Sequence, residues 1–343
     1  MDSLSQYVLG AGIGVAVMGR RTPVWKAALW GGIAGTIPDL DALIDHGDPI
    51  RNMTFHRAES HSLLYLTILA PALAVGVAKL HGEMQQFRRW WLALWLALFT
   101  HPLLDNMTIY GTQLLQPFTD HPYFIGSVFI IDPLYALPLL FGLIATGISR
   151  RPDRLRWNRL GVIVSTVYLG WSMLAQQFVQ QIASRDLAAQ GIATAQMIVT
   201  PTPFNTVLWR VLSMSPEGRS YHEGFYSIFD GSLRDGRRAI RFDRFERDTD
   251  LHAALATNWS VARMAWFSQG YYRMRERDGV ARIADLRMGQ EPNYTFEFTV
   301  AQRGSAWQAI APQNVGERGD NLRGALTWLW RRMWGADLPP PRS

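Results

Sequence analysis

The stretch Phe55-His56-Arg57-Ala58-Glu59-Ser60-His61-Ser62 carries two imidazoles five residues apart, directly before a long apolar run that begins at Leu63. Upstream, Pro38-Asp39-Leu40-Asp41-Ala42-Leu43-Ile44-Asp45 places three carboxylates at the end of another apolar run. Downstream, Thr100-His101-Pro102-Leu103-Leu104-Asp105 does the same with an imidazole and a carboxylate. Zinc, manganese and iron accept such ligands, and ionisable groups at the ends of membrane helices are costly. We therefore predict that the three stretches meet in one metal site.

The 343-residue chain is long enough for two domains, and its charge is unevenly distributed. Only 18% of the residues are charged, below the ~25% typical of soluble proteins, and the deficit falls in the first half. The absence of cysteine excludes disulfides, thiolate metal ligands and thiol catalysis. The net charge of +6 is a weak sign of nucleic-acid binding, because the arginines cluster in short loops beside apolar runs. We expect no nucleic-acid partner.

Six apolar segments approach the ~20 residues that a helix needs to cross a bilayer. The first is short and glycine-rich, so it packs tightly or re-enters the membrane rather than spanning it. We predict a multi-pass α-helical membrane domain over residues 1–180, carrying the metal site. Its segments are Leu4–Gly19, Trp25–Ile44, Ser62–Leu80, Trp90–Asn106, Ser127–Ile148 and Asn158–Val179.

Basic residues concentrate in alternate loops, which the positive-inside rule places in the cytoplasm. Arg20 and Arg21 lie between the first two segments, and Arg88 and Arg89 lie between the third and fourth. Five arginines lie between the fifth and sixth or at the very start of the sixth, namely Arg150, Arg151, Arg154, Arg156 and Arg159. This orientation brings the aspartates and histidines of the three stretches to one depth at the outer face. It also places the rest of the chain outside, in the periplasm.

Residues 181–343 predict a small α+β domain with an antiparallel sheet. Gly279–Arg287 and Pro292–Gln302, which alternates apolar and polar residues, read as a hairpin. Tyr221–Phe229 and Ala239–Phe245 predict two further strands, joined through turns at Asp230-Gly231 and Asp235-Gly236.

Two helices are predicted in the same domain. Leu251–Tyr271 predicts the first, and the Trp- and Arg-rich segment Asn321–Trp334 predicts the second, near the end of the chain. The second helix either lies on the membrane surface or packs on its own sheet.

Seven residues are candidate metal ligands. His101 and Asp105 are four apart, so a helix puts both on one face. Asp39 and Asp41 are two apart and converge only at a helix end or turn. Asp132, near the outer end of the fifth segment, is a ligand, an orienting group or a helix cap. The predicted ligands are Asp39, Asp41, His56, His61, His101, Asp105 and Asp132.

Three other charged residues are candidates for catalytic roles. Arg57 would pair with an anionic substrate such as a phosphoester, unless its side chain merely snorkels to the interface. Asp45 or Glu59, left without a metal, would act as general base or orient an imidazole.

A family resemblance covers about the first 180 residues. It rests on Pro38-Asp39-x-Asp41, His56-Arg57-x-x-x-His61-Ser62-Leu63, His101-Pro102-Leu103-Leu104-Asp105, Tyr110-Gly111-Thr112-Gln113-Leu114-Leu115-x-Pro117-Phe118 and Asp132-Pro133. In order and spacing these motifs resemble the YdjM-like family of bacterial inner-membrane metal-dependent hydrolases, linked in places to LexA regulation. The resemblance implies a multi-pass membrane protein, a divalent metal and hydrolysis. A more distant similarity to zinc-dependent phospholipases C and related nucleases favours phosphoesters.

We therefore expect a membrane-bound, metal-dependent hydrolase at the outer face of the inner membrane, acting on a phosphoester or lipid-like substrate, with membrane lipid as its partner. The expected cofactor is a divalent metal, zinc first and manganese next, which would lower the pKa of water and polarise the scissile bond. A divalent-cation transporter and a non-catalytic scaffold with a structural metal stay open as alternatives. His-Glu-x-x-His metalloproteases and Gly-x-Ser-x-Gly serine hydrolases are disfavoured because neither motif occurs.

Overall fold

The computed structural model describes residues 1–231, 239–316 and 321–342, and the chain divides into two compact units. Unit 1 contains Met1–Ile44, His56–Met173 and Pro203–Asn205. Unit 2 contains Asp45–Phe55, Leu174–Thr202 and the remainder from Thr206 onward.

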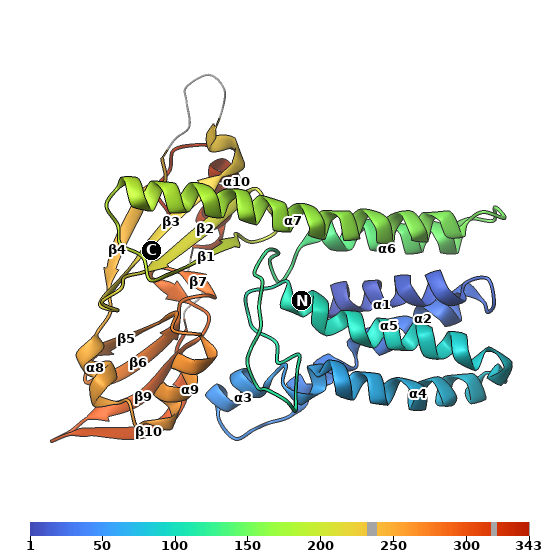
Figure 1. Ribbon diagram of the computed structural model, residues 1–343, viewed down its shortest axis with the longest axis horizontal. Coiled ribbons are helices and arrows are strands. Elements are labelled where there is room, and N and C mark those ends of the chain that lie inside the picture. The colour runs from blue at the N-terminus through green and yellow to red at the C-terminus, as the bar shows by residue number, and fades with distance from the viewer. Residues whose placement is uncertain (232–238, 317–320, 343) are drawn as a thin grey trace. The chain divides into compact units, whose positions relative to one another are not determined.

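Unit 1 is helical, and Figure 1 shows its helices lying side by side with similar axes. Three of them begin at a side-chain cap, since Asp2, Ser62 and Asp132 each accept a hydrogen bond from a backbone N–H of the first turn. The elements are α1 (Ser3–Met18), α2 (Val24–Thr36), the 3₁₀ helix η1 (Pro38–Leu43), the 3₁₀ helix η2 (Glu59–His61), α4 (Leu63–Leu80), η3 (Met84–Gln86), α5 (Phe87–Asn106), α6 (Pro133–Ile148) and the first part of α7 (Leu155–Ala189).

Glycines bring α1 and α2 into backbone contact. A β-carbon added at Gly10 would lie 2.3 Å from the Gly31 carbonyl oxygen, and one at Gly14 would lie 2.2 Å from the Ala27 carbonyl oxygen. Neither position tolerates a side chain without the helices moving apart, the close approach that small residues permit in membrane helices. This packing holds the end of α2, and η1 after it, next to the C-terminal part of α5.

Two apolar clusters fill unit 1. The larger joins α1, α2, α4 and α5 around the fully buried side chains of Trp90, Leu94 and Leu98. The second joins α1, α5, α6 and α7 and includes Val8 and Leu139. Both clusters use α1 and α5, so these two helices are the frame on which the other helices pack.

Of the described helices, two are long and apolar enough to cross a membrane, namely α4 and α7. The prediction of about six spans is therefore wrong. Helices α1 and α6 have 16 residues each and α2 has 13, short of the ~20 that a span needs. Helix α5 has 20 residues, but Arg88, Arg89 and Asp105 lower its hydropathy. Helix α2 is short because the chain changes to 3₁₀ geometry at Pro38.

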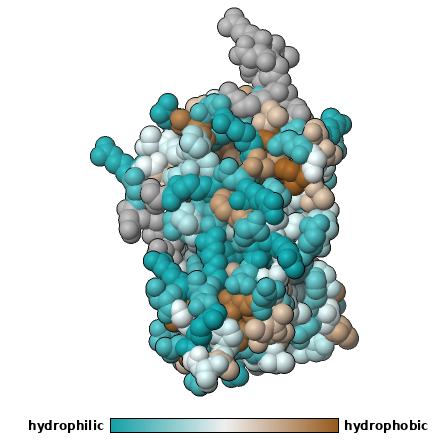
Figure 2. All heavy atoms as spheres, turned by 90° about the vertical axis from the view of Figure 1, so that its left-hand side faces the viewer, coloured by the Kyte–Doolittle hydropathy of each residue, from teal (hydrophilic) through white to brown (hydrophobic). Residues whose placement is uncertain are grey.

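Unit 2 contains two four-stranded antiparallel sheets, in the orders β1-β2-β3-β4 and β10-β9-β6-β5. The predicted helical region followed by a small antiparallel-sheet domain is thus confirmed. The face of unit 2 seen in Figure 2 is mainly hydrophilic, with small separate apolar patches. The elements are α3 (Pro49–Phe55), the rest of α7, β1 (Gln196–Pro201), β2 (Leu208–Met214), β3 (Ser220–Ser227), η4 (Ile228–Gly231), β4 (Phe242–Glu246), α8 (Thr249–Ala254), α9 (Trp259–Phe267), β5 (Tyr272–Arg277), β6 (Val280–Asp285), β7 (Gly289–Gln290), β8 (Asn293–Tyr294), β9 (Glu297–Arg303), β10 (Trp307–Asn314) and α10 (Leu322–Met333).

The strands and helices predicted for unit 2 are present, but their boundaries and connections differ from the prediction. The predicted hairpin is present as the antiparallel pair β6–β9, but its connection is longer and contains the β7–β8 ribbon. The predicted helix Leu251–Tyr271 is two helices, because Asn258 leaves helical geometry and caps α9. Strands β3 and β4 pair as predicted, and the turn at Asp235-Gly236 lies outside the described residues.

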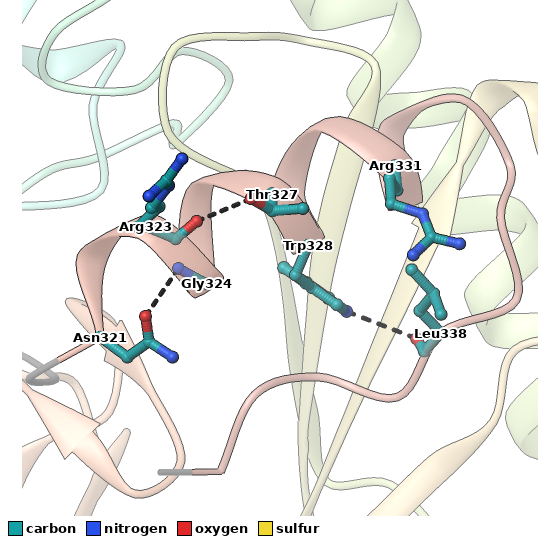
Figure 3. Close-up of a pocket in the computed structure, with 7 residues that line it drawn as sticks. All are labelled: Asn321, Arg323, Gly324, Thr327, Trp328, Arg331 and Leu338. Carbon is teal, nitrogen blue, oxygen red and sulfur yellow. Dashed lines mark hydrogen bonds between the residues drawn. The ribbon is translucent and has the colours of Figure 1, made fainter.

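Helix α10 packs one face on the first sheet. The Trp328 ring meets Phe225 edge to face at 5.2 Å, and its indole N–H donates to the Leu338 carbonyl at 3.4 Å (Figure 3). Arg332 forms a buried ion pair with Asp230. Trp330, on the other side of the helix, is 61% exposed. The helix therefore packs on its own sheet and keeps a second face open.

Candidate metal centre

Residues from all three stretches identified in the sequence meet in unit 1. One ligand atom from each of four residues lies within 4.8 Å of all the others, and the residues are Asp39, His61, His101 and Asp105. The Nε2 atoms of His61 and His101 are 3.1 Å apart. Asp105 Oδ2 is 3.1 Å from His61 Nε2 and 3.4 Å from His101 Nε2. Asp39 Oδ1 is 3.7 Å and 3.5 Å from the same two nitrogens.

The local sequence explains how these side chains are aimed. His101 and Asp105 are one turn apart on α5 and share its face, as their spacing predicts. A 3₁₀ helix has three residues per turn, so Asp39 and Asp41 on η1 point in different directions. Asp39 faces the four-atom cluster, whereas Asp41 faces the loop before η2. His61 ends η2, directly before Ser62 caps α4.

Hydrogen bonds behind the cluster assign the tautomers of both imidazoles. His101 Nδ1 is 2.7 Å from the Gly35 carbonyl, which can only accept, so this nitrogen carries a proton. His61 Nδ1 is 2.8 Å from Ser60 Oγ, whose own proton goes to Asp41 Oδ2 at 2.6 Å. His61 Nδ1 therefore donates to Ser60. In the neutral rings both Nε2 atoms then turn lone pairs toward the cluster.

Four electron-rich atoms consequently face one another. His61, His101 and Asp105 are fully buried, and Asp105 Oδ2 accepts no hydrogen bond, although the charged Arg57 Nε lies 3.2 Å from it. Buried charges are normally paired or bound to a metal, because an unpaired one carries a large desolvation penalty. Two imidazole nitrogens and two carboxylate oxygens form a donor set that zinc, manganese and iron accept. The residues therefore fit a divalent cation, and the link from His61 through Ser60 to a carboxylate is typical of metal-binding histidines.

The other oxygen of Asp105 has partners that sequence reasoning missed. Gln6 Nε2 donates to Asp105 Oδ1 at 2.9 Å and to the His101 carbonyl at 3.2 Å. The α-amino group of Met1 also contacts Asp105 Oδ1. The available signal was a buried amide near the start of an otherwise apolar, glycine-rich segment.

Arg57 lies buried beside the cluster in a strained conformation. Its φ of 66° falls in the left-handed region, which is uncommon for a residue other than glycine. Its Nε is 3.2 Å from Asp105 Oδ2, and its guanidinium carbon is 4.9 Å from the Tyr110 ring centroid. The backbone N–H of Arg57 donates to Asp41 at 2.9 Å, and Nη1 donates to Thr108 at 3.2 Å. These contacts hold the guanidinium next to the candidate ligands.

Asp41 and His56, both predicted as ligands, contribute no atom to the four-atom cluster and instead lie beside His61. His56 Nδ1 is 2.8 Å from Asp41 Oδ1, and the His56 side chain is 25% exposed. Its ring is edge-on to His61, with the centroids 5.9 Å apart. Burial acts to raise the pKa of Asp41, but the contacts with His56 and His61 outweigh it and hold that pKa well below its usual range. Asp41 is therefore an ionised acceptor that orients both imidazoles.

The structure does not bring Asp132 to the cluster. Asp132 is the buried cap of α6, where it accepts from the Leu134 N–H at 3.0 Å and from the Tyr168 hydroxyl at 2.9 Å. Of the three roles expected for it, capping is the one that its position satisfies. A carboxylate directly before a proline in the first helical turn is the sequence signal for such a cap.

Neither of the two predicted general bases is among the four residues whose ligand atoms converge. Asp45 belongs to unit 2 and is exposed, and it accepts from the Gly47 N–H at 2.9 Å and from Asn52 Nδ2 at 3.1 Å. Glu59 is exposed at the first position of η2. Both roles stay predictions, and the positions of these side chains add no support to them.

Comparison with known proteins identifies the first half of the chain. The YdjM inner membrane protein family matches residues 1–179, slightly more than half of the chain, and this segment contains all four candidate ligands. The uncharacterized protein YfhP of Bacillus subtilis (strain 168) is 27% identical over 142 residues, which is 39% of this chain and 42% of YfhP. The chain thus spans less than half the length of that relative. No solved structure matches it significantly. By its match over residues 1–179, the chain belongs to the YdjM inner membrane protein family.

Proposed function

We propose that this protein is a membrane-bound, metal-dependent hydrolase that acts on a phosphoester or lipid-like substrate at the outer face of the inner membrane. The observation that carries the proposal is the cluster of Asp39, His61, His101 and Asp105, whose ligand atoms lie within 4.8 Å of one another. Zinc is the first candidate cation and manganese the second. A divalent cation held there would activate water and polarise a phosphoryl oxygen.

Arg57 supplies a binding group for an anionic substrate. Its guanidinium is buried within 3.2 Å of Asp105, so a substrate phosphate that reaches the cluster also reaches the arginine. Arginine recognises phosphate through two parallel N–H groups, which fixes the orientation of the anion as well as its affinity. The left-handed backbone at Arg57 supports a functional role, because strain of this kind concentrates at active sites.

His56 is better placed than Asp45 or Glu59 to move a proton. Its Nδ1 donates to Asp41, so Nε2 of the neutral ring is a proton acceptor. A carboxylate that orients an imidazole in this way is the arrangement found in many general-base catalysts. The partial exposure of His56, in contrast with the buried His61, gives a substrate access to it.

The proposed outer location rests on the distribution of basic residues. Arginines concentrate in the loops at the ends of the helices that carry no candidate ligand, as expected for the cytoplasmic side. The ligand-bearing ends then face outward, and unit 2 is periplasmic. A substrate in the outer leaflet would reach such a site sideways from the bilayer.

A structural metal in a non-catalytic scaffold is the second candidate function. The burial of the cluster favours it, since three of the four ligands are fully buried and the Asp39 side chain is only 13% exposed. Four protein ligands form a closed tetrahedral site in structural zinc centres, whereas catalytic centres keep one position open.

His56 separates the two candidates experimentally. The full-length protein in detergent is assayed for metal content and for hydrolysis of bis(p-nitrophenyl) phosphate and of phospholipid vesicles. If the protein is a hydrolase, His61→Ala should lose both metal and activity. His56→Ala should keep the metal and lose activity at least about 100-fold, the lower end for a general base. His81→Ala is the matched control, because His81 accepts from Trp30 Nε1 away from the cluster. A metal-loaded wild type without hydrolysis of either substrate would favour the scaffold.

A further inference from the structure

A second charged site lies at the other end of the unit 1 helices. Four arginines border a hollow of about 330 Å³, and they are Arg20, Arg21, Arg89 and Arg159. Arg20 and Arg21 follow α1, Arg89 is in the first turn of α5, and Arg159 is near the start of α7. Apolar residues of α1 (Val15–Val17), Leu155 and Asn158 complete the lining.

The four arginines lack the acidic partners that other basic residues nearby have. Lys26 pairs with Glu83 at 3.3 Å, and Arg156 pairs with Asp153 at 2.7 Å. Within the described chain, none of the four arginines around the hollow forms an ion pair. Four unneutralised charges around one concave site repel each other and raise the local potential, so the site attracts anions.

Asn158 lines the hollow but is occupied with packing between helices. Its Nδ2 donates to the Gly12 carbonyl at 2.9 Å, and the residue is 2% exposed. Asn158 therefore holds α7 against α1 beside the hollow and leaves the recognition of an anion to the four arginines.

Helix geometry places this hollow far from the metal centre. Arg89 and Asp105 lie on the same helix, sixteen residues apart (105 − 89), which corresponds to about 24 Å along the axis at 1.5 Å per residue. The hydrocarbon core of a bilayer is about 30 Å thick. If the candidate ligands lie at one membrane surface, the arginines lie at the headgroups of the opposite leaflet, where anionic lipids attract basic residues.

We propose that the hollow is a binding site for the headgroup of an anionic phospholipid. The arginines bind the phosphate, and the acyl chains lie along α7. The outer surface of α7 suits this, because Leu160 and Ile163 are 51% and 50% exposed. The site is independent of the proposed hydrolysis, since it shares no residue with the candidate metal centre.

Native mass spectrometry of the full-length protein in detergent tests the proposal. Phosphatidylglycerol, phosphatidylcholine and inorganic phosphate are titrated separately onto wild type, the double variant Arg20→Gln/Arg21→Gln, and Arg150→Gln. Arg150 is the matched control, an exposed arginine that follows α6 and does not line the hollow. Wild type should bind phosphatidylglycerol at least about tenfold more tightly than phosphatidylcholine. The double variant should lose most of that preference, and Arg150→Gln should keep it.

Three outcomes would overturn the proposal. The first is equal binding of the two lipids by wild type. The second is an equal loss in Arg150→Gln, which would mean that scattered surface charge is responsible. The third is saturation by inorganic phosphate with no preference for lipid, which would identify a soluble anion as the ligand. Metal content measured on the same samples should not change, so this result is separable from the fate of the metal centre.

Discussion

Both units bury a cluster of polar side chains, and the two clusters are built in opposite ways. In unit 2, Arg210 Nε donates to Glu223 at 2.7 Å, and Arg273 and Tyr221 both donate to Glu291. Each buried carboxylate there has a cationic or hydroxyl donor. In unit 1, by contrast, the atoms that converge are two imidazole lone pairs and two carboxylate oxygens.

The difference separates a cluster held together by ion pairs from one whose facing atoms could hold a metal ion. The unit 2 cluster joins residues of both sheets, since Arg210 and Glu223 lie on β2 and β3 and Arg273 lies on β5. Its carboxylates are paired with buried arginines of both sheets, so the cluster helps to fix the two sheets together. In unit 1, donors reach Asp105 from behind, but the four atoms that face one another are two imidazole nitrogens and two carboxylate oxygens, a set that a cation could bind. The predictions below test this contrast in order of expected effect.

The largest effect is expected where a balanced cluster loses one partner. Glu223→Ala leaves the buried Arg210 without its carboxylate, and it should lower the free energy of unfolding of unit 2 by about 3–5 kcal/mol. Denaturant titration with limited proteolysis measures this. Glu276→Ala, which removes a partly exposed pair with Arg303, should cost no more than about 1 kcal/mol. Equal losses in the two variants would mean that the unit 2 cluster has no special structural role.

A smaller effect is expected from the residue that orients His61. Ser60→Ala removes the hydrogen bond that holds the His61 tautomer, and it should weaken metal binding about 10–100-fold in a chelator competition assay. Ser62→Ala, two residues away, removes the α4 cap and should cost about 1 kcal/mol of stability with metal affinity unchanged. Unchanged affinity in Ser60→Ala would contradict the tautomer assignment.

The smallest effect is expected in the metal-free protein. Asp39→Asn replaces one of the facing carboxylates with an amide whose N–H groups can donate to the Nε2 atoms of His61 and His101. The free energy of unfolding of the chelator-treated variant should therefore stay within about 1 kcal/mol of wild type, or rise. The new amide adds a hydrogen-bond donor at a place where acceptor atoms face one another in the wild-type protein. Metal binding should fall in the same variant. A loss of stability comparable to that of Glu223→Ala would show that Asp39 already has a matched partner.

Sequence patterns predicted the parts of this molecule that depend on local spacing. The i, i+4 relation of His101 and Asp105 placed both on one helix face, and alternation along β9 predicted its strand. The spacing of Asp39 and Asp41 along the chain did not predict which of them faces the cluster, since this depends on the 3₁₀ geometry of η1. The contact from Gln6 was also missed, because it depends on the packing of α1 against α5.

The number of spans was overestimated for a related reason. Hydropathy along the chain records apolar residues but not where a helix ends. The segment Trp25–Ile44 is apolar enough to resemble one span, yet its helix ends at Thr36 and the aspartates follow in a separate element. That early end is what brings Asp39 to the ligands of α5.

Metal analysis of the purified full-length protein tests the central claim most directly. Samples prepared without chelator, and then reloaded with zinc or manganese, are measured by inductively coupled plasma mass spectrometry. Wild type and His56→Ala should hold about one divalent ion per chain, as expected for a single four-ligand site, and His61→Ala and His101→Ala should hold none. A wild-type protein that binds no metal after reloading, or ligand variants that bind as much as wild type, would contradict the account.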